Sequence, residues 1–142
     1  MTPAPDQLLD FARRYAAAWC SQDPSSVAEH YAPEGSLTIN GAPPAVGRAA
    51  ITEAARGFMV ALPDMQVLLD ELLVQDSGIE FHWTFTGTNT GPGGTGNCVR
   101  ISGFEEWTID DDGLIAESQG HYDQAEYDRQ LEHGWKSPSG SG

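Results

Sequence analysis

The feature that most constrains the fold is a series of four β-type segments in the second half of the chain, separated by residues that favour turns. The segments span Met65–Gln75, Ile79–Gly87, Cys98–Ile109 and Leu114–Tyr122. They are separated by Asp76-Ser77-Gly78, by a loop containing Gly91–Gly96, and by Asp110-Asp111-Asp112-Gly113. Because short connections join neighbouring antiparallel strands, this pattern predicts a meander.

Two helices are expected at the start of the chain. The first spans Asp6–Ser21 and carries an apolar stripe at three- and four-residue spacing, formed by Leu8, Phe11, Ala12, Tyr15 and Trp19. Asp23 before Pro24 predicts an N-cap followed by a proline in the first turn. A short second helix is therefore expected to continue through Val27 to Tyr31.

A third helix is expected before the meander. A short strand over Ser36–Asn40 and a loop over Gly41–Gly47 precede it. The apolar spacing then indicates a helix from about Arg48 to Leu62, which Pro63 ends. Three helices followed by a long sheet predict an α+β fold in which helices cover one face of the sheet.

The charge of the chain limits its partners. With 21 acidic and 7 basic side chains, the formal charge of −14 would repel nucleic acid and anionic membranes. The loop Gly91–Gly96 contains Pro92 and lacks a following Lys-Ser/Thr pair, so a flexible hairpin tip is expected there, not a phosphate-binding loop. We expect no nucleic acid and no membrane partner.

The chain has the length of one domain, expected over residues 1–135, with a flexible, linker-like tail over 136–142. Residues 1–10 lack the basic start and long apolar run of a signal peptide, which favours a cytoplasmic location. No His/Cys/Asp cluster has the spacing of metal ligands, and Cys20 is expected to be a buried thiol. We therefore expect no metal and no cofactor.

Four stretches together carry a resemblance to a known family. They are Phe85-Thr-Gly-Thr-Asn-Thr-Gly91, Gly113-Leu-Ile-Ala-Glu117, His121-Tyr-Asp123 and Gln130-Leu131. In this order and spacing they resemble the SnoaL-like polyketide cyclases over nearly the whole chain. The resemblance implies a cone-shaped nuclear transport factor 2-like fold, with three N-terminal helices packed on a curved, mostly antiparallel sheet. It also implies a cavity that holds a small apolar organic molecule.

The resemblance implies a catalytic carboxylate at Asp123, because members carry an aspartate about seven residues before a Gln-Leu pair. Burial in an apolar cavity would raise the pKa of such a base. The alternative is that Asp123 caps a C-terminal helix, and the family match favours the cavity. Strand alternation places His121 on the same side of the sheet as Asp123, where it would act as an orienting or proton-shuttling partner. The alternative is that His121 lies exposed on the outer face.

Glu105 is the third catalytic candidate, because it shares one face of its strand with apolar residues, namely Ile101, Trp107 and Ile109. It is either buried with a partner such as Tyr15 or turned outward by a bulge near Gly103. The first helix also resembles that of bacterial ketosteroid isomerases, with Tyr15 and Glu105 at the positions of their oxyanion-hole residues. This resemblance implies that the two side chains bind a carbonyl oxygen together.

Three positions depart from these families. Asn89 stands where many SnoaL-like members carry histidine, and Ile39 stands where the isomerases carry their general-base aspartate. Limonene epoxide hydrolases share the late aspartate but need an Arg-x-Asp pair where this chain has His82-Trp-Thr84. The expected chemistry is therefore neither isomerase-like nor epoxide hydrolase-like in full.

The cavity wall is expected to contain large apolar residues suited to a flat ligand, most of which also form the core. The candidates are Trp19, Phe58, Met59, Trp83 and Trp107. Asn40, at the end of the first strand, either donates a hydrogen bond to a ligand or, as we favour, caps the following turn.

The leading functional hypothesis is a cofactor-independent cyclase, or a related lyase or isomerase, acting on a polyketide-like or terpenoid-like compound. The alternative is a binding domain of the same fold without catalysis, and a further alternative is an epoxide hydrolase-like or ketosteroid isomerase-like enzyme. A homodimer joined through the outer sheet face is also expected, because helices cover only one side of the sheet.

Overall fold

The computed structural model describes residues 5–75 and 78–135. Its helices are α1 (Pro5–Cys20), α2 (Pro24–Ala28), α3 (Arg48–Ala61) and α4 (Gln124–His133). Its strands are β1 (Tyr31–Ile39), β2 (Ala45–Val46), β3 (Gln66–Gln75), β4 (Gly78–Thr88), β5 (Cys98–Ile109) and β6 (Ile115–His121). The predicted turn residues Asp76 and Ser77 and the tail 136–142 lie outside the described residues.

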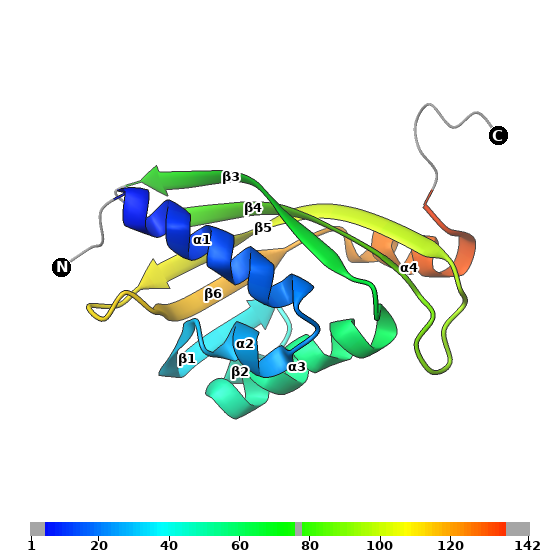
Figure 1. The fold of residues 1–142 in the computed structure, drawn as a ribbon, viewed down its shortest axis with the longest axis horizontal. Coiled ribbons are helices and arrows are strands. Elements are labelled where there is room, and N and C mark those ends of the chain that lie inside the picture. Colours follow the sequence, from blue (N-terminus) through cyan, green and yellow to red (C-terminus); the bar gives the residue numbers. More distant parts are fainter. Residues whose placement is uncertain (1–4, 76–77, 136–142) are drawn as a thin grey trace.

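The described strands form one sheet in the order β2-β1-β6-β5-β4-β3. Strands β1 and β6 pair in parallel, and the other neighbouring pairs are antiparallel. Figure 1 shows α1 crossing the sheet, α2 and α3 beside β1, and α4 at the far end of the sheet. The predicted α+β fold with a curved, mostly antiparallel sheet is confirmed.

The helices cover a single face of this sheet. Ring contacts join Tyr15 of α1 to Phe81, at 5.4 Å between centroids, and Tyr127 of α4 to Phe85, at 5.7 Å. Phe58 of α3 also packs on Phe85. Because Phe81 and Phe85 are four positions apart on β4, they point to the same side of the sheet. The core therefore lies between the helices and this inner face.

The local signals for the helices are confirmed. The predicted apolar stripe of α1 is buried along its whole length. The side chain of Asp23 accepts a hydrogen bond from the backbone of Ser25, and Pro24 occupies the first turn of α2. No helix in the described part of the chain is long and apolar enough to span a membrane.

The region around β1 differs from the prediction. β1 begins at Tyr31 instead of Ser36, and the short helix α2 ends at Ala28. The pairing of β1 with β6 shifts register between Tyr31 and Ser36, so regular alternation is interrupted there and the strand is hidden in the sequence. The predicted loop Gly41–Gly47 contains β2, whose two residues are too few to show any pattern.

Gly103 makes room for a large side chain on the inner face. It lies opposite Trp83 in the pairing of β4 with β5. A Cβ atom at Gly103 would lie 2.3 Å from the carbonyl oxygen of His121 and 2.8 Å from Cζ2 of Trp83. The position of the Trp83 indole therefore depends on the absence of a side chain at Gly103.

We predict that Gly103→Ala destabilises the protein by about 1–3 kcal/mol, the usual cost of an extra methyl group in a packed region. The matched control is Gly57→Ala on α3, where an added Cβ meets nothing within 4 Å. That substitution should stabilise the protein by up to about 1 kcal/mol, because alanine favours the helix. Urea unfolding measures both changes, and equal stability of the two variants would contradict the prediction.

Candidate functional site

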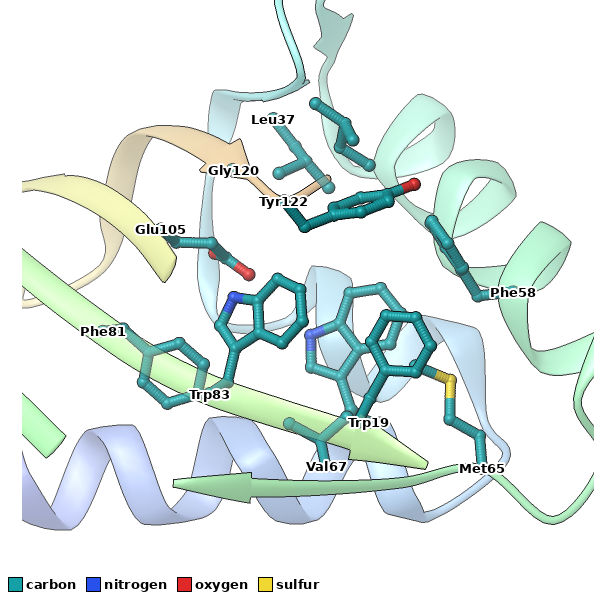
Figure 2. Close-up of a pocket in the computed structure, with 12 residues that line it drawn as sticks. Trp19, Leu37, Phe58, Met65, Val67, Phe81, Trp83, Glu105, Gly120 and Tyr122 are labelled. Atoms are coloured by element: carbon teal, nitrogen blue, oxygen red, sulfur yellow. The ribbon is translucent and has the colours of Figure 1, made fainter. Parts of the chain in front are cut away.

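A cavity of about 50 Å³ lies between the inner sheet face and helices α1 and α3. Its wall is mostly aromatic, and Figure 2 shows Trp19 and Phe58 from the helices facing Trp83 and Tyr122 from the sheet side. Among the described residues that line it, Glu105 alone carries a carboxylate. The cavity is therefore an apolar space with one ionisable acid in its wall.

Glu105 is held by donors from three elements. Its Oε1 accepts hydrogen bonds from Ser118 Oγ at 2.7 Å, from Trp107 Nε1 at 2.9 Å and from the Tyr15 hydroxyl at 3.0 Å. The Tyr15 hydroxyl also lies 2.8 Å from the hydroxyl of Tyr31. Because the single proton of Tyr15 points to the carboxylate, Tyr31 donates to Tyr15. The network fixes the orientation of the carboxyl group.

Burial controls the ionisation of this network. Removal from water raises the pKa of Glu105, although the hydrogen bonds from Ser118, Trp107 and Tyr15 favour the charged form and oppose the shift. Burial, and then the nearby charge of Glu105, raise the pKa of Tyr15 well above its ordinary value. Tyr15 therefore remains a donor, while burial makes the neutral form of Glu105 more accessible than that of an exposed glutamate.

Glu105 lines the cavity, and its two carboxyl oxygens are bonded unequally. Ser118, Trp107 and Tyr15 all donate to Oε1, whereas the contact of the Tyr15 hydroxyl with Oε2 is longer, at 3.2 Å. Gly120 lies opposite Glu105 in the pairing of β5 with β6 and lines the cavity. A Cβ atom at Gly120 would lie 3.6 Å from Cγ of Glu105. The absence of this side chain leaves space beside the carboxyl group.

The structure resolves the two alternatives for Glu105. The pairing of β4 with β5 runs without a shift through Gly103, so no bulge turns Glu105 outward. The alternative in which Glu105 is buried against Tyr15 is confirmed. Tyr15 and Trp107 do not line the cavity, and their polar atoms donate hydrogen bonds to Glu105. Both side chains hold the Glu105 carboxyl group in place by hydrogen bonds without contacting the cavity themselves.

The expected placement of Asp123 in the cavity is wrong. Asp123 is exposed, and its Oδ1 accepts a hydrogen bond from the backbone of Glu126 at 3.0 Å as the N-cap of α4. β6 ends at His121, so the alternation that would direct Asp123 inward stops before it. The capping alternative is the one that the structure shows.

His121 also lies away from the cavity. Ser118 and Gly120 face the interior, so the odd-numbered neighbour His121 points to the outer sheet face. There its Nε2 lies 2.8 Å from Oε1 of Glu106, and its ring packs on Phe104. The structure therefore does not bring His121 and Asp123 together with Glu105.

The predicted wall residues divide into two groups. Trp19, Phe58 and Trp83 line the cavity, whereas Met59 is buried in the core outside the lining. Asn40 is exposed, has a positive φ of 51°, and its Oδ1 accepts a hydrogen bond from the backbone of Tyr122. This contact joins the end of β1 to the segment after β6, and Asn40 does not belong to the cavity lining.

Sequence reasoning missed Tyr31, Ser118, Gly120 and Tyr122. Tyr31 was assigned to the end of a helix, and the other three lie on or just after β6. Their proximity to Glu105 follows from the register between β5 and β6, where Glu105 pairs with Gly120 and Trp107 with Ser118. The available signal in the sequence was that Ser118 and Gly120 are two residues apart on one strand and therefore face the same side of the sheet.

Asn89, which stands where many related sequences carry histidine, forms hydrogen bonds to the backbone. Its Nδ2 donates to the carbonyl of Ala61 at 2.9 Å, and its Oδ1 accepts from the backbone of Thr95 at 2.9 Å. It does not belong to the cavity lining. Within residues 5–75 and 78–135, no group of three or more His, Cys, Asp or Glu side chains is arranged to hold a metal ion.

Comparison with solved structures shows the same fold in several proteins. TsrD from Streptomyces laurentii is 22% identical and matches with a TM-score of 0.77 over 91% of this chain and 97% of its own. AclR from Streptomyces galilaeus is 21% identical, with a TM-score of 0.77 over 92% and 98%. A Catenulispora acidiphila protein with a ketosteroid isomerase-like fold, solved with trimethylamine, is 14% identical, with a TM-score of 0.76 over 93% and 95%.

The fold is therefore that of the nuclear transport factor 2-like and ketosteroid isomerase-like proteins. Among curated proteins, no significant sequence match was found. The sequence profile of the family described as SnoaL-like polyketide cyclase matches residues 9–131. Because this match covers most of the chain, the protein belongs to the SnoaL-like polyketide cyclase family.

Proposed function

We propose that the chain binds a small, largely apolar carbonyl compound in the cavity and transfers protons on it without a cofactor, with Glu105 as acid and base. The observation that carries this proposal is a buried carboxyl group that lines the apolar cavity and is anchored through Oε1 by three donors. Family membership supports a polyketide-like or terpenoid-like substrate and an aldol-type ring closure, or a related lyase or isomerase reaction.

The proposed reaction needs a single carboxyl group. In its charged form, Glu105 removes a proton from the carbon next to a carbonyl group, which leaves an enolate. The enolate carbon forms a bond with a second carbonyl carbon of the same ligand, and the resulting alkoxide takes the proton back from Glu105. The raised pKa suits both steps, because it strengthens the carboxylate as a base and makes the protonated form easier to populate than in an exposed glutamate.

The size of the cavity limits the ligand. A volume of about 50 Å³ is below the roughly 150 Å³ that holds a benzene ring in a protein core. A ring-sized ligand must therefore displace part of the wall. Ile39, Phe58 and Tyr122 are the partly exposed residues of the lining and are the side chains best able to move.

A second candidate function is ligand binding without catalysis, and the wall at Ile39 favours it. Ile39 lines the cavity at the position where the related isomerases carry their general base, so no second carboxylate faces Glu105.

The epoxide hydrolase alternative finds no support at His82-Trp83-Thr84. Of these three residues only Trp83 lines the cavity, and the Thr84 hydroxyl is bound to Asp70.

The proposal predicts that Glu105→Gln lowers turnover of a small cyclisable diketone by about 100-fold or more, equivalent to roughly 2.7 kcal/mol of transition-state stabilisation. Glutamine keeps an oxygen for the three donors but cannot exchange the proton, so affinity and stability should be preserved. Initial rates, isothermal calorimetry and thermal unfolding measure the three properties.

The matched control is Glu106→Gln, which changes the adjacent, exposed carboxylate on the outer face. It should leave turnover unchanged within a few-fold. Unchanged turnover in Glu105→Gln would remove Glu105 from the mechanism. Binding without any turnover by the unmodified protein would favour the second candidate function.

We also propose a homodimer joined through the outer sheet face. No described helix packs on this face, which carries Phe104 between the rings of His82 and His121 and has Leu68 48% exposed. Burial of these groups favours association. Sedimentation velocity at micromolar concentration should show a dimer that Phe104→Glu converts to a monomer. A monomeric unmodified protein would contradict the prediction.

A further inference from the structure

Trp83 presents a buried hydrogen-bond donor that has no partner. In the described part of the chain, its Nε1 is the one buried side-chain nitrogen or oxygen atom without a hydrogen bond. The side chain is only 7% exposed and lines the cavity. Buried N–H groups are nearly always paired, because an unpaired one loses its hydrogen bond to water without compensation. An unpaired donor in a cavity wall therefore points to a ligand acceptor.

The packing of the indole fixes the direction of this donor. The ring stacks on Phe85 at 5.5 Å between centroids and meets the edge of Tyr122 at 6.1 Å. Its Cζ2 and Cη2 atoms occupy the space that a side chain at Gly103 would fill. The indole is therefore enclosed on several sides, and its N–H group is not free to turn toward solvent.

The Trp83 indole lies beside Glu105 on the inner face of the sheet. Trp83 pairs with Gly103 and Phe81 pairs with Glu105, so Trp83 and Glu105 are diagonal neighbours on the inner face. Figure 2 shows the indole nitrogen on the side of the ring that faces the Glu105 carboxyl group. The rest of the wall is almost entirely apolar. One donor and one carboxyl group thus form the polar corner of the cavity.

This corner selects a particular ligand chemistry. The indole N–H requires an acceptor, which excludes ammonium groups at that point. The lining contains no lysine or arginine, and Glu105 would repel a carboxylate ligand. A neutral carbonyl oxygen satisfies both conditions. The faces of Trp19, Phe58 and Phe85 suit the planar, apolar remainder of such a ligand.

We infer that Trp83 Nε1 donates a hydrogen bond to the carbonyl oxygen of a planar, conjugated ketone and holds the adjacent C–H group toward Glu105. The inference rests on the proposed function, since it assigns the substrate class of the same cavity. As Glu105 removes the proton, negative charge develops on the carbonyl oxygen, and the Trp83 N–H stabilises it. Trp83 therefore anchors the oxygen, and Glu105 exchanges the proton.

The test uses acetophenone and α-methylstyrene, which have the same skeleton and differ in one atom, a carbonyl oxygen against a methylene carbon. Calorimetry should show that the unmodified protein prefers acetophenone. In Trp83→Phe this preference should fall by about tenfold, the effect of losing one hydrogen bond. The control Trp19→Phe removes a different indole from the wall and should change both affinities by the same factor.

A second measurement uses the unmodified protein. The Trp83→Phe variant is needed only to assign the indole N–H signal of Trp83. In proton–nitrogen NMR spectra, the indole N–H signal of Trp83 should move downfield with acetophenone and not with α-methylstyrene. Either an unchanged preference in Trp83→Phe or equal shifts with the two compounds would overturn the inference. The absence of a preference in the unmodified protein, including the absence of binding, would overturn it as well.

These outcomes are separable from the failure of the proposed function. If Glu105→Gln abolishes turnover while the preference for acetophenone does not depend on Trp83, proton transfer by Glu105 stands and the anchoring role is lost. If acetophenone binds through Trp83 while no carbonyl compound is turned over, the anchoring role stands and the catalytic proposal is lost.

Discussion

The burial of Glu105 within an apolar sheet face is the constraint on which the rest of the site depends. A charge removed from water is tolerated only with several donors around it, and Ser118, Trp107 and Tyr15 supply them from β6, β5 and α1. Tyr31 of β1 extends the network through Tyr15. One carboxyl group therefore links α1 and β1, near the start of the chain, to β5 and β6, near its end. The hydrogen bonds that stabilise the carboxyl group also fix its orientation.

The two oxygens of this carboxyl group are bonded unequally. Oε1 accepts hydrogen bonds from three donors, Oε2 has the longer contact with Tyr15, and both Glu105 and Trp83, with its unpaired indole N–H, line the cavity. Glycines at two positions create this arrangement, since Gly120 leaves space beside Glu105 and Gly103 leaves space for the Trp83 ring. The absence of side chains at Gly103 on β5 and Gly120 on β6 therefore determines which polar groups a ligand can contact.

Much of this fold was predictable from alternation and caps, and β5 was placed with its correct bounds. Parity with Trp107 indicated an inward position for Glu105, but the continuous pairing of β4 with β5 was needed to exclude a bulge that would turn it outward. The position of Asp123 was not predictable, because the sequence does not state whether β6 continues through it or ends at His121. Partners such as Ser118 depend on the cross-strand register, which forms only when distant segments pair. The unpaired Trp83 N–H and the cavity volume depend on how several aromatic rings pack, which no spacing rule describes.

The most direct test of the central claim is the pKa of Glu105 itself. A pH titration of carbon-13-labelled glutamate side chains by NMR, with the Glu105 signal assigned from its loss in Glu105→Gln, measures that value in the folded protein. Burial predicts a midpoint clearly above the usual glutamate value of about 4.3. A midpoint for Glu105 at or below the usual value would show a permanently ionised structural carboxylate and would contradict its role as acid and base.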